Sequence, residues 1–154
     1  MSSTASTEVF FYHLEHRSLA SVLPELLERT LQRGWRAVVQ VGSEARIEAL
    51  DTQLWTYADD SFLPHGTARD GHGANQPIYL TAGDDNPNGA HVRFLADGAD
   101  HGDLSGYARA VFLFDGRDET AVQRARQQWK TVKVAGLAAT YWQQNDQGKW
   151  QKKA

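Results

Sequence analysis

The fold is decided by residues 8–41, EVFFYHLEHRSLASVLPELLERTLQRGWRAVVQV. An aromatic and β-branched run at residues 8–13 is typical of a buried strand. Leucine and valine then recur at helical spacing over residues 19–31, and a second strand pattern follows at residues 37–41. The stretch therefore predicts a strand, a helix and a second strand.

Punctuating residues agree with this order of elements. Gly34 is placed to end the first helix, whereas Pro24 fits that helix only if it lies in the first turn. After residue 41, Gly42 and Ser43 supply a turn and a helix cap. The alternation of strands and helices predicts a mostly parallel sheet covered by helices. Apolar residues on one face of the second helix are Ile47, Leu50 and Leu54.

The rest of the chain continues the pattern after a long irregular stretch at residues 56–75. Further strands are expected at residues 78–81, 92–96, 110–114 and 138–142, and a last helix begins at residues 115–119 and ends before Gly136. No internal repeat or linker divides the chain, so residues 1–154 are expected to form one domain. Flexible ends are expected at residues 1–7 and 151–154.

Composition places the chain among ordinary globular proteins. The 154 residues are 41% hydrophobic and 23% charged, and none is cysteine. No apolar run approaches the roughly 20 residues that cross a bilayer, and residues 1–7 have no signal-peptide pattern. A cytoplasmic protein without membrane association, disulfides or thiolate-bound metal is expected.

Charge is distributed unevenly along the chain. Residues 1–116 carry 8 Lys/Arg against 16 Asp/Glu, a balance of −8, whereas residues 117–154 carry 8 against 3, a balance of +5. The C-terminal quarter is therefore a basic pole, which can attract phosphate, a membrane surface or an acidic peptide.

Nucleotide chemistry is not indicated. The sequence has neither G-x-G-x-x-G after the first strand nor a G-x-x-x-x-G-K-[ST] motif. The turn at residues 14–17 offers no glycine, and Glu15 would repel a phosphate. No cofactor is expected.

An acid pair and a histidine raise the alternative of a small metal-dependent enzyme built on the 56–75 loop. The candidates are Asp59, Asp60, His65, Asp70 and His72, with Ser61 as a possible nucleophile. Their spacing matches no metal-ligand pattern, and Ser61 lacks the glycines of a nucleophile elbow. We therefore expect no catalytic or metal-ligating residue here.

Large apolar side chains gather at the same place. Trp55, Tyr57, Phe62 and Leu63 follow one another where a helix gives way to a loop. Such residues either pack onto the core or form an interface with a partner, because tryptophan and phenylalanine contribute most to protein interfaces.

The last helix combines charge with an aromatic ring. At about 100° per residue, Arg126, Lys130 and Lys133 lie on one side of the helix, next to an apolar stripe that contains Trp129. This pattern fits a solvated amphipathic helix, and it also fits a surface that holds an acidic peptide.

The sequence resembles the chi subunit family of bacterial DNA polymerase III over nearly its whole length. The motifs that carry the resemblance are Val9–Leu14, Leu54-Trp55 with Ser61–His65, Gln76–Thr81, Arg126-x-x-Trp129-Lys130 with Lys133–Gly136, and Thr140–Gln144 with Gly148–Trp150. The resemblance implies a Rossmann-like three-layer α/β/α sandwich with a mostly parallel sheet and no phosphate-binding loop.

The resemblance also implies a function without catalysis. Chi is an accessory subunit of the clamp-loader complex in the replicative DNA polymerase assembly, monomeric alone and a heterodimer with the psi subunit. It bridges psi and the acidic C-terminal tail of the single-stranded-DNA-binding protein, and so meets DNA only indirectly. The psi-facing residues would be Trp55, Phe62, Leu63, Pro64 and His65, and the tail would bind Arg126, Trp129 and Lys130, with Lys133 added from the helical geometry.

Direct binding of single-stranded DNA is a further alternative. The basic C-terminal quarter contains Trp142 and Trp150, whose rings could stack on bases.

Overall fold

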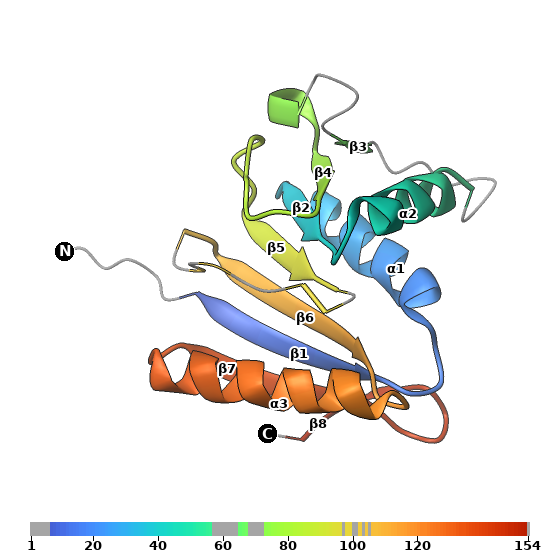
Figure 1. Ribbon diagram of the computed structural model, residues 1–154, viewed down its shortest axis with the longest axis vertical. Helices are drawn as coiled ribbons and strands as arrows, with labels where there is room; N and C mark the ends of the chain where they lie inside the picture. Colours follow the sequence, from blue (N-terminus) through green and yellow to red (C-terminus); the bar gives the residue numbers. More distant parts are fainter. Residues whose placement is uncertain are drawn as a thin grey trace.

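The computed structural model describes residues 7–56, 65–67, 73–96, 98, 99, 102, 104 and 106–153, without the side chains of Ala20, Trp55 and Thr56. Within these residues an eight-stranded sheet is flanked by three α-helices (Figure 1). The strands are β1 (Glu8–Leu14), β2 (Ala37–Gln40), β3 (His65–Thr67), β4 (Ile78–Thr81), β5 (Val92–Leu95), β6 (Arg109–Asp115), β7 (Ala138–Gln144) and β8 (Trp150–Lys152). The helices are α1 (Leu19–Gln32), α2 (Glu44–Thr56) and α3 (Glu119–Val134), with a short 3₁₀ helix, η2 (Gly73–Asn75).

The strands lie in the order β3-β4-β2-β5-β6-β1-β7-β8. Every neighbouring pair is parallel except β7 and β8, which are antiparallel. Helices α1 and α2 pack on one face of the sheet, and α3 packs on the other face against β1, β6 and β7. The predicted mostly parallel three-layer α/β sandwich is confirmed.

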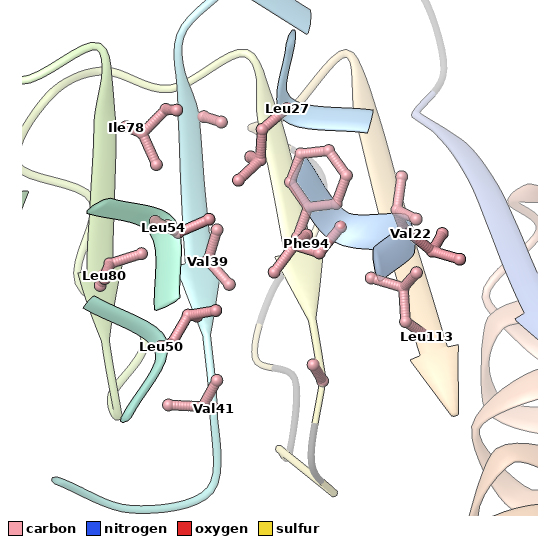
Figure 2. Close-up of a cluster of buried hydrophobic side chains, with 14 of the residues drawn as sticks. Val22, Leu27, Val39, Val41, Leu50, Leu54, Ile78, Leu80, Phe94 and Leu113 are labelled. Atoms are coloured by element: carbon pink, nitrogen blue, oxygen red, sulfur yellow. The ribbon is translucent and has the colours of Figure 1, made fainter. Parts of the chain in front are cut away.

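The core beneath α1 and α2 contains the apolar faces that the sequence predicted. Figure 2 shows Leu50 and Leu54 of α2 next to Val39 and Leu80 of the sheet. All four side chains are buried. Alternation along β2 sends Val39 to this face and Val38 to the opposite one.

On the face of the sheet that carries α3, loops cover the strands that α3 does not contact. Val38 and Tyr79 of the sheet are buried there with Ala90 and Tyr107, which belong to the connections before β5 and before β6. Arg93 of β5 lies beneath these connections and is 2% exposed. A buried arginine therefore joins the sheet to the loops that cover it.

The guanidinium group of Arg93 is fully hydrogen-bonded. Its Nε and Nη2 donate to Gln40 Oε1 at 3.0 and 2.7 Å, and Nη1 donates to Tyr107 Oη at 2.9 Å. The backbone oxygens of Gly83 and Asp85 accept the remaining bonds at 2.5 and 3.1 Å. Five donors thus meet oxygen atoms from β2 and from both connections.

Glycines follow the ends of α1 and α3 as predicted, but Pro24 does not lie in the first turn of α1. Gly34 and Gly136 adopt φ values of 79° and 82° directly after the C-caps of α1 and α3. Helix α1 begins at Leu19, so Pro24 lies in the second turn rather than in the first. Pro24 therefore removes one internal helix hydrogen bond, a loss that the buried packing of Leu23 and Leu27 offsets.

Two short strands were not predicted. His65–Thr67 forms β3 within the stretch expected to be irregular, and Trp150–Lys152 forms β8 at the other edge of the sheet. Each has three residues, which is too short for a hydrophobic period to mark it.

Candidate functional site

Helix α3 presents cations along one edge. The Asp118 side chain caps its first turn by accepting hydrogen bonds from the amides of Thr120 and Ala121 at 3.0 and 3.4 Å. Ala125 and Val132 are buried against the sheet, and this orientation sets the position of every other side chain on the helix. The predicted basic stripe, Arg126, Lys130 and Lys133, is exposed on one side of this buried line.

Trp129 joins the basic stripe to the core. Its half-buried ring packs edge-on against Phe11 and Tyr141, with centroids 5.3 and 5.9 Å apart. The Nζ atom of Lys133 lies 5.6 Å from the centroid of the Trp129 ring, within reach of a cation–π interaction. The structure thus brings Arg126, Trp129, Lys130 and Lys133 together on one helix.

A polar cluster that the sequence did not reveal lies beside Trp129. His13 Nδ1 is 2.5 Å from Tyr141 Oη, and His13 Nε2 is 3.0 Å from Glu15 Oε1. The side-chain amide of Gln143 donates to the same Glu15 oxygen at 2.8 Å. These groups form a continuous chain between β1 and β7.

Electrostatics link this cluster to the stripe. Burial lowers the pKa of His13, and the Glu15 carboxylate opposes that shift. Burial raises the pKa of the Tyr141 phenol, which the charge of Arg126 opposes. Arg126 therefore lies close enough to lower the pKa of both His13 and Tyr141.

Gly116 makes room for the same histidine. A Cβ atom at this position would lie 1.9 Å from His13 Nε2, which is a clash with the ring itself. Any larger residue here would displace His13 from Tyr141.

The second predicted surface is only partly described. Trp55 lies in the last turn of α2, and Phe62, Leu63 and Pro64 lie outside the described residues. His65 begins β3, and its side chain is 0% exposed. Its Nε2 atom is 2.9 Å from Asp51 Oδ1, so His65 joins β3 to α2.

Of the residues considered for the alternative metal site, His65 is the one that the structure describes. Asp59, Asp60, Ser61, Asp70 and His72 lie outside the described residues. Within the described part of the chain, no group of three or more His, Cys, Asp or Glu side chains could hold a metal ion.

The two tryptophans of the DNA-binding alternative lie on neighbouring strands. Trp150 of β8 packs on Tyr12 with centroids 4.8 Å apart, and Trp142 of β7 pairs with Lys152 in the sheet. Both tryptophans are half-buried.

Among the helices of the described residues, none has the length and apolar character to span a bilayer.

Fold and surface together define an α/β protein whose described candidate site is a cationic, aromatic helix face. Residues 6–140 match the family model described as DNA polymerase III chi subunit, HolC. The chain belongs to the DNA polymerase III chi subunit family. It is also similar to a probable DNA polymerase III subunit chi from Rickettsia prowazekii (strain Madrid E), with 32% identity over 89 residues. That similarity covers 58% of this chain and 54% of the relative.

Proposed function

We propose that the chain is a non-catalytic accessory subunit of the DNA polymerase III holoenzyme. In this role it bridges the psi subunit and the acidic C-terminal tail of the single-stranded-DNA-binding protein in the cytoplasm, and it needs no cofactor. Family membership supports the assignment to the polymerase assembly. The single observation that carries the bridging role is the exposed row of Arg126, Lys130 and Lys133 beside Trp129.

The stripe suits an acidic tail that ends in an aromatic residue. Arg126 and Lys130 would pair with carboxylates of the tail, because charge-assisted hydrogen bonds are stronger than neutral ones. The terminal aromatic side chain would pack beside Trp129, whose ring is held by Phe11 and Tyr141. Lys133 would contribute further positive charge.

A peptide titration at several salt concentrations tests this role. A synthetic peptide with an acidic run and a C-terminal phenylalanine should bind the whole chain, and its Kd should rise steadily with salt because exposed charges are screened. The measurement is calorimetry, with a peptide of the same composition in scrambled order as control. Equal affinity for both peptides, or affinity independent of salt, would contradict the proposal.

The psi-facing surface would be formed by Trp55, Phe62, Leu63 and Pro64. His65 would support this surface from the protein side, because its buried side chain joins β3 to α2 through Asp51. Trp55 lies in the last turn of α2, next to the segment that carries the other three residues. Large apolar anchors of this kind contribute most of the binding energy at protein interfaces.

Trp55→Ala should weaken binding to psi at least tenfold, because truncating a central aromatic anchor costs about 2–4 kcal/mol. The measurement is the affinity of the purified chain for psi, with circular dichroism to establish that the variant is folded. Trp150→Ala is the matched control, since it removes an indole from β8 at the opposite edge of the sheet. Unchanged psi affinity in folded Trp55→Ala would exclude this surface.

A further inference from the structure

A cavity of about 470 Å³ opens at the carboxyl edge of the sheet. Its walls include Leu14 at the end of β1, Leu95 at the end of β5 and Phe114 near the end of β6. The beginnings of α1 and α3 close it from the two sides, through Leu19 and Ala121. Its volume lies within the range of about 300–1,000 Å³ that is typical of small-molecule sites.

The cavity lies where the chain leaves the sheet in opposite directions. β1 and β6 are parallel neighbours, but β1 leads into α1 on one face and β6 leads into α3 on the other. Open α/β sheets bind ligands in the crevice outside the carboxyl ends of two such strands. The cavity therefore occupies the place in this fold that is most suited to a ligand.

Four arginines from four segments contribute to the lining of the cavity. They belong to Arg17 after β1, Arg46 in α2, Arg117 before α3 and Arg124 in α3. The acidic residues in its lining are Asp115 and Asp118, and Glu25 pairs with the Arg17 guanidinium at 2.6 and 3.0 Å, so these seven side chains carry a balance of 4 − 3 = +1. The charge of the lining therefore favours an anion over a cation.

The two acids already have partners within the protein. Asp118 accepts hydrogen bonds from two amides of α3, and Asp115 Oδ1 accepts one from the amide of Arg117 at 2.9 Å and one from the Arg117 Nε at 3.4 Å. Arg124 donates from Nη1 to the Gly98 oxygen at 2.5 Å, and a guanidinium group has five N–H donors. Donors on Arg124 therefore remain for a ligand at the rim.

Backbone amides do not supply this site. The amides of Glu15, His16 and Arg17, in the turn after β1, all donate to Gln144 Oε1 at 3.0, 2.9 and 3.2 Å. A side-chain oxygen of β7 thus fills the position that a phosphate oxygen occupies in a glycine-rich loop. An anion in the cavity would bind the arginine side chains instead.

The ligand chemistry follows from the two kinds of lining. Guanidinium forks match the oxygens of phosphate, and the negative charge of a phosphate monoester is attracted by the positive excess of the lining. Leu19, Leu95 and Phe112 provide an apolar wall for a ring or sugar. We propose that the cavity binds a small phosphate-bearing molecule of about mononucleotide size.

This site is separate from the surface proposed for the acidic tail. On α3, Arg124 and Gln128 lie on one side of the buried line of Ala125 and Val132, and the basic stripe lies on the other side. The two sites can therefore be tested independently with paired substitutions.

The test measures thermal stabilisation of the whole chain by adenosine 5′-monophosphate, with adenosine, ribose 5-phosphate and inorganic phosphate in parallel. At a few mM, adenosine 5′-monophosphate should raise the melting temperature by several degrees in a saturable manner, because a ligand that binds only the folded state stabilises it. Adenosine, which lacks the phosphate, should have no effect. Comparison of inorganic phosphate, ribose 5-phosphate and adenosine 5′-monophosphate shows how much the sugar and the base add to the thermal stabilisation.

Paired variants locate the binding. Arg46→Gln with Arg117→Gln should raise the Kd for adenosine 5′-monophosphate at least tenfold and leave the acidic peptide bound. Arg126→Gln with Lys130→Gln, which removes the same charge on the other side of α3, should show the reverse pattern. Ala121→Phe should block the nucleotide by filling the cavity without changing charge.

Four results would overturn the proposal: no stabilisation by any phosphate compound, stabilisation by adenosine alone, equal stabilisation by inorganic phosphate and the nucleotide, or equal loss in both paired variants. A chain that fails these tests and still binds the acidic peptide would keep its proposed role as a bridge. A chain that binds the nucleotide but not the peptide would lose that role and keep this site.

Discussion

Arg93→Met should lower the free energy of unfolding by about 3–5 kcal/mol, the largest effect on stability that we expect from a single substitution in this protein. Methionine has a similar length and no hydrogen-bond donors. The substitution would leave the buried Gln40 Oε1 and the part-buried backbone oxygens of Gly83 and Asp85 without the partner that they have now. Each buried acceptor that loses its partner costs about 1–3 kcal/mol.

The cost is high because Arg93 connects three parts of the chain. It hydrogen-bonds to β2 through Gln40, to the connection after β4 through Gly83, and to the connection before β6 through Tyr107. Lysine would not replace it, since an ammonium group has three donors and lacks the planar fork. Arg93→Lys is therefore expected to recover only part of the loss.

Urea unfolding followed by circular dichroism measures this effect, with Arg29→Met as the matched control. Arg29 is exposed on α1, so the same chemical change there should cost less than about 0.5 kcal/mol. A loss of under about 1 kcal/mol for Arg93→Met would show that the loops hold to the sheet without the guanidinium group.

Arg93 also illustrates what periodicity could not show. A strand was predicted at residues 92–96 from their short apolar run, and β5 spans Val92–Leu95. An arginine within that run usually indicates a solvent-facing position. Its burial depends on Gln40, 53 residues away, and on loops whose course no local pattern encodes.

The elements that were predicted correctly share strong local signals. Ile47, Leu50 and Leu54 repeat at helical spacing, and all three are buried in the core beneath α2. Strands β3 and β8 have three residues each, so the pairing of β3 with β4 and of β8 with β7 depends on tertiary contacts. Short edge strands of this kind leave no period in the sequence.

The candidate sites also differ in whether local sequence patterns could predict them. Arg126, Lys130 and Lys133 belong to one helix, so their common face follows from its geometry alone. His13 and Tyr141 are 128 residues apart and meet only because β1 and β7 pair in register. The cavity at the carboxyl edge likewise draws its arginines from four segments. Sites within one element could be predicted, whereas sites between elements required the fold.

Reversing two charges on α3 should abolish binding of the acidic peptide. Arg126→Glu with Lys130→Glu is expected to raise the Kd at least 100-fold, because each charge-assisted hydrogen bond contributes about 1.5 kcal/mol or more and the new carboxylates repel the tail. Both side chains are exposed, so the fold should not change. Calorimetry measures the affinity, and the melting temperature should stay within about 2 °C of the original.

A change in overall charge could weaken the same complex without any contact at the stripe. Each replacement changes the net charge by −2, so the double variant carries −7 instead of −3. Arg29→Glu with Arg33→Glu makes the same change at an exposed residue of α1 and at its exposed C-cap, on the opposite face of the sheet. If both double variants lose the peptide equally, the attraction comes from the field of the whole protein, and α3 is not the binding surface. If only the α3 variant loses it, the tail contacts Arg126 and Lys130 directly.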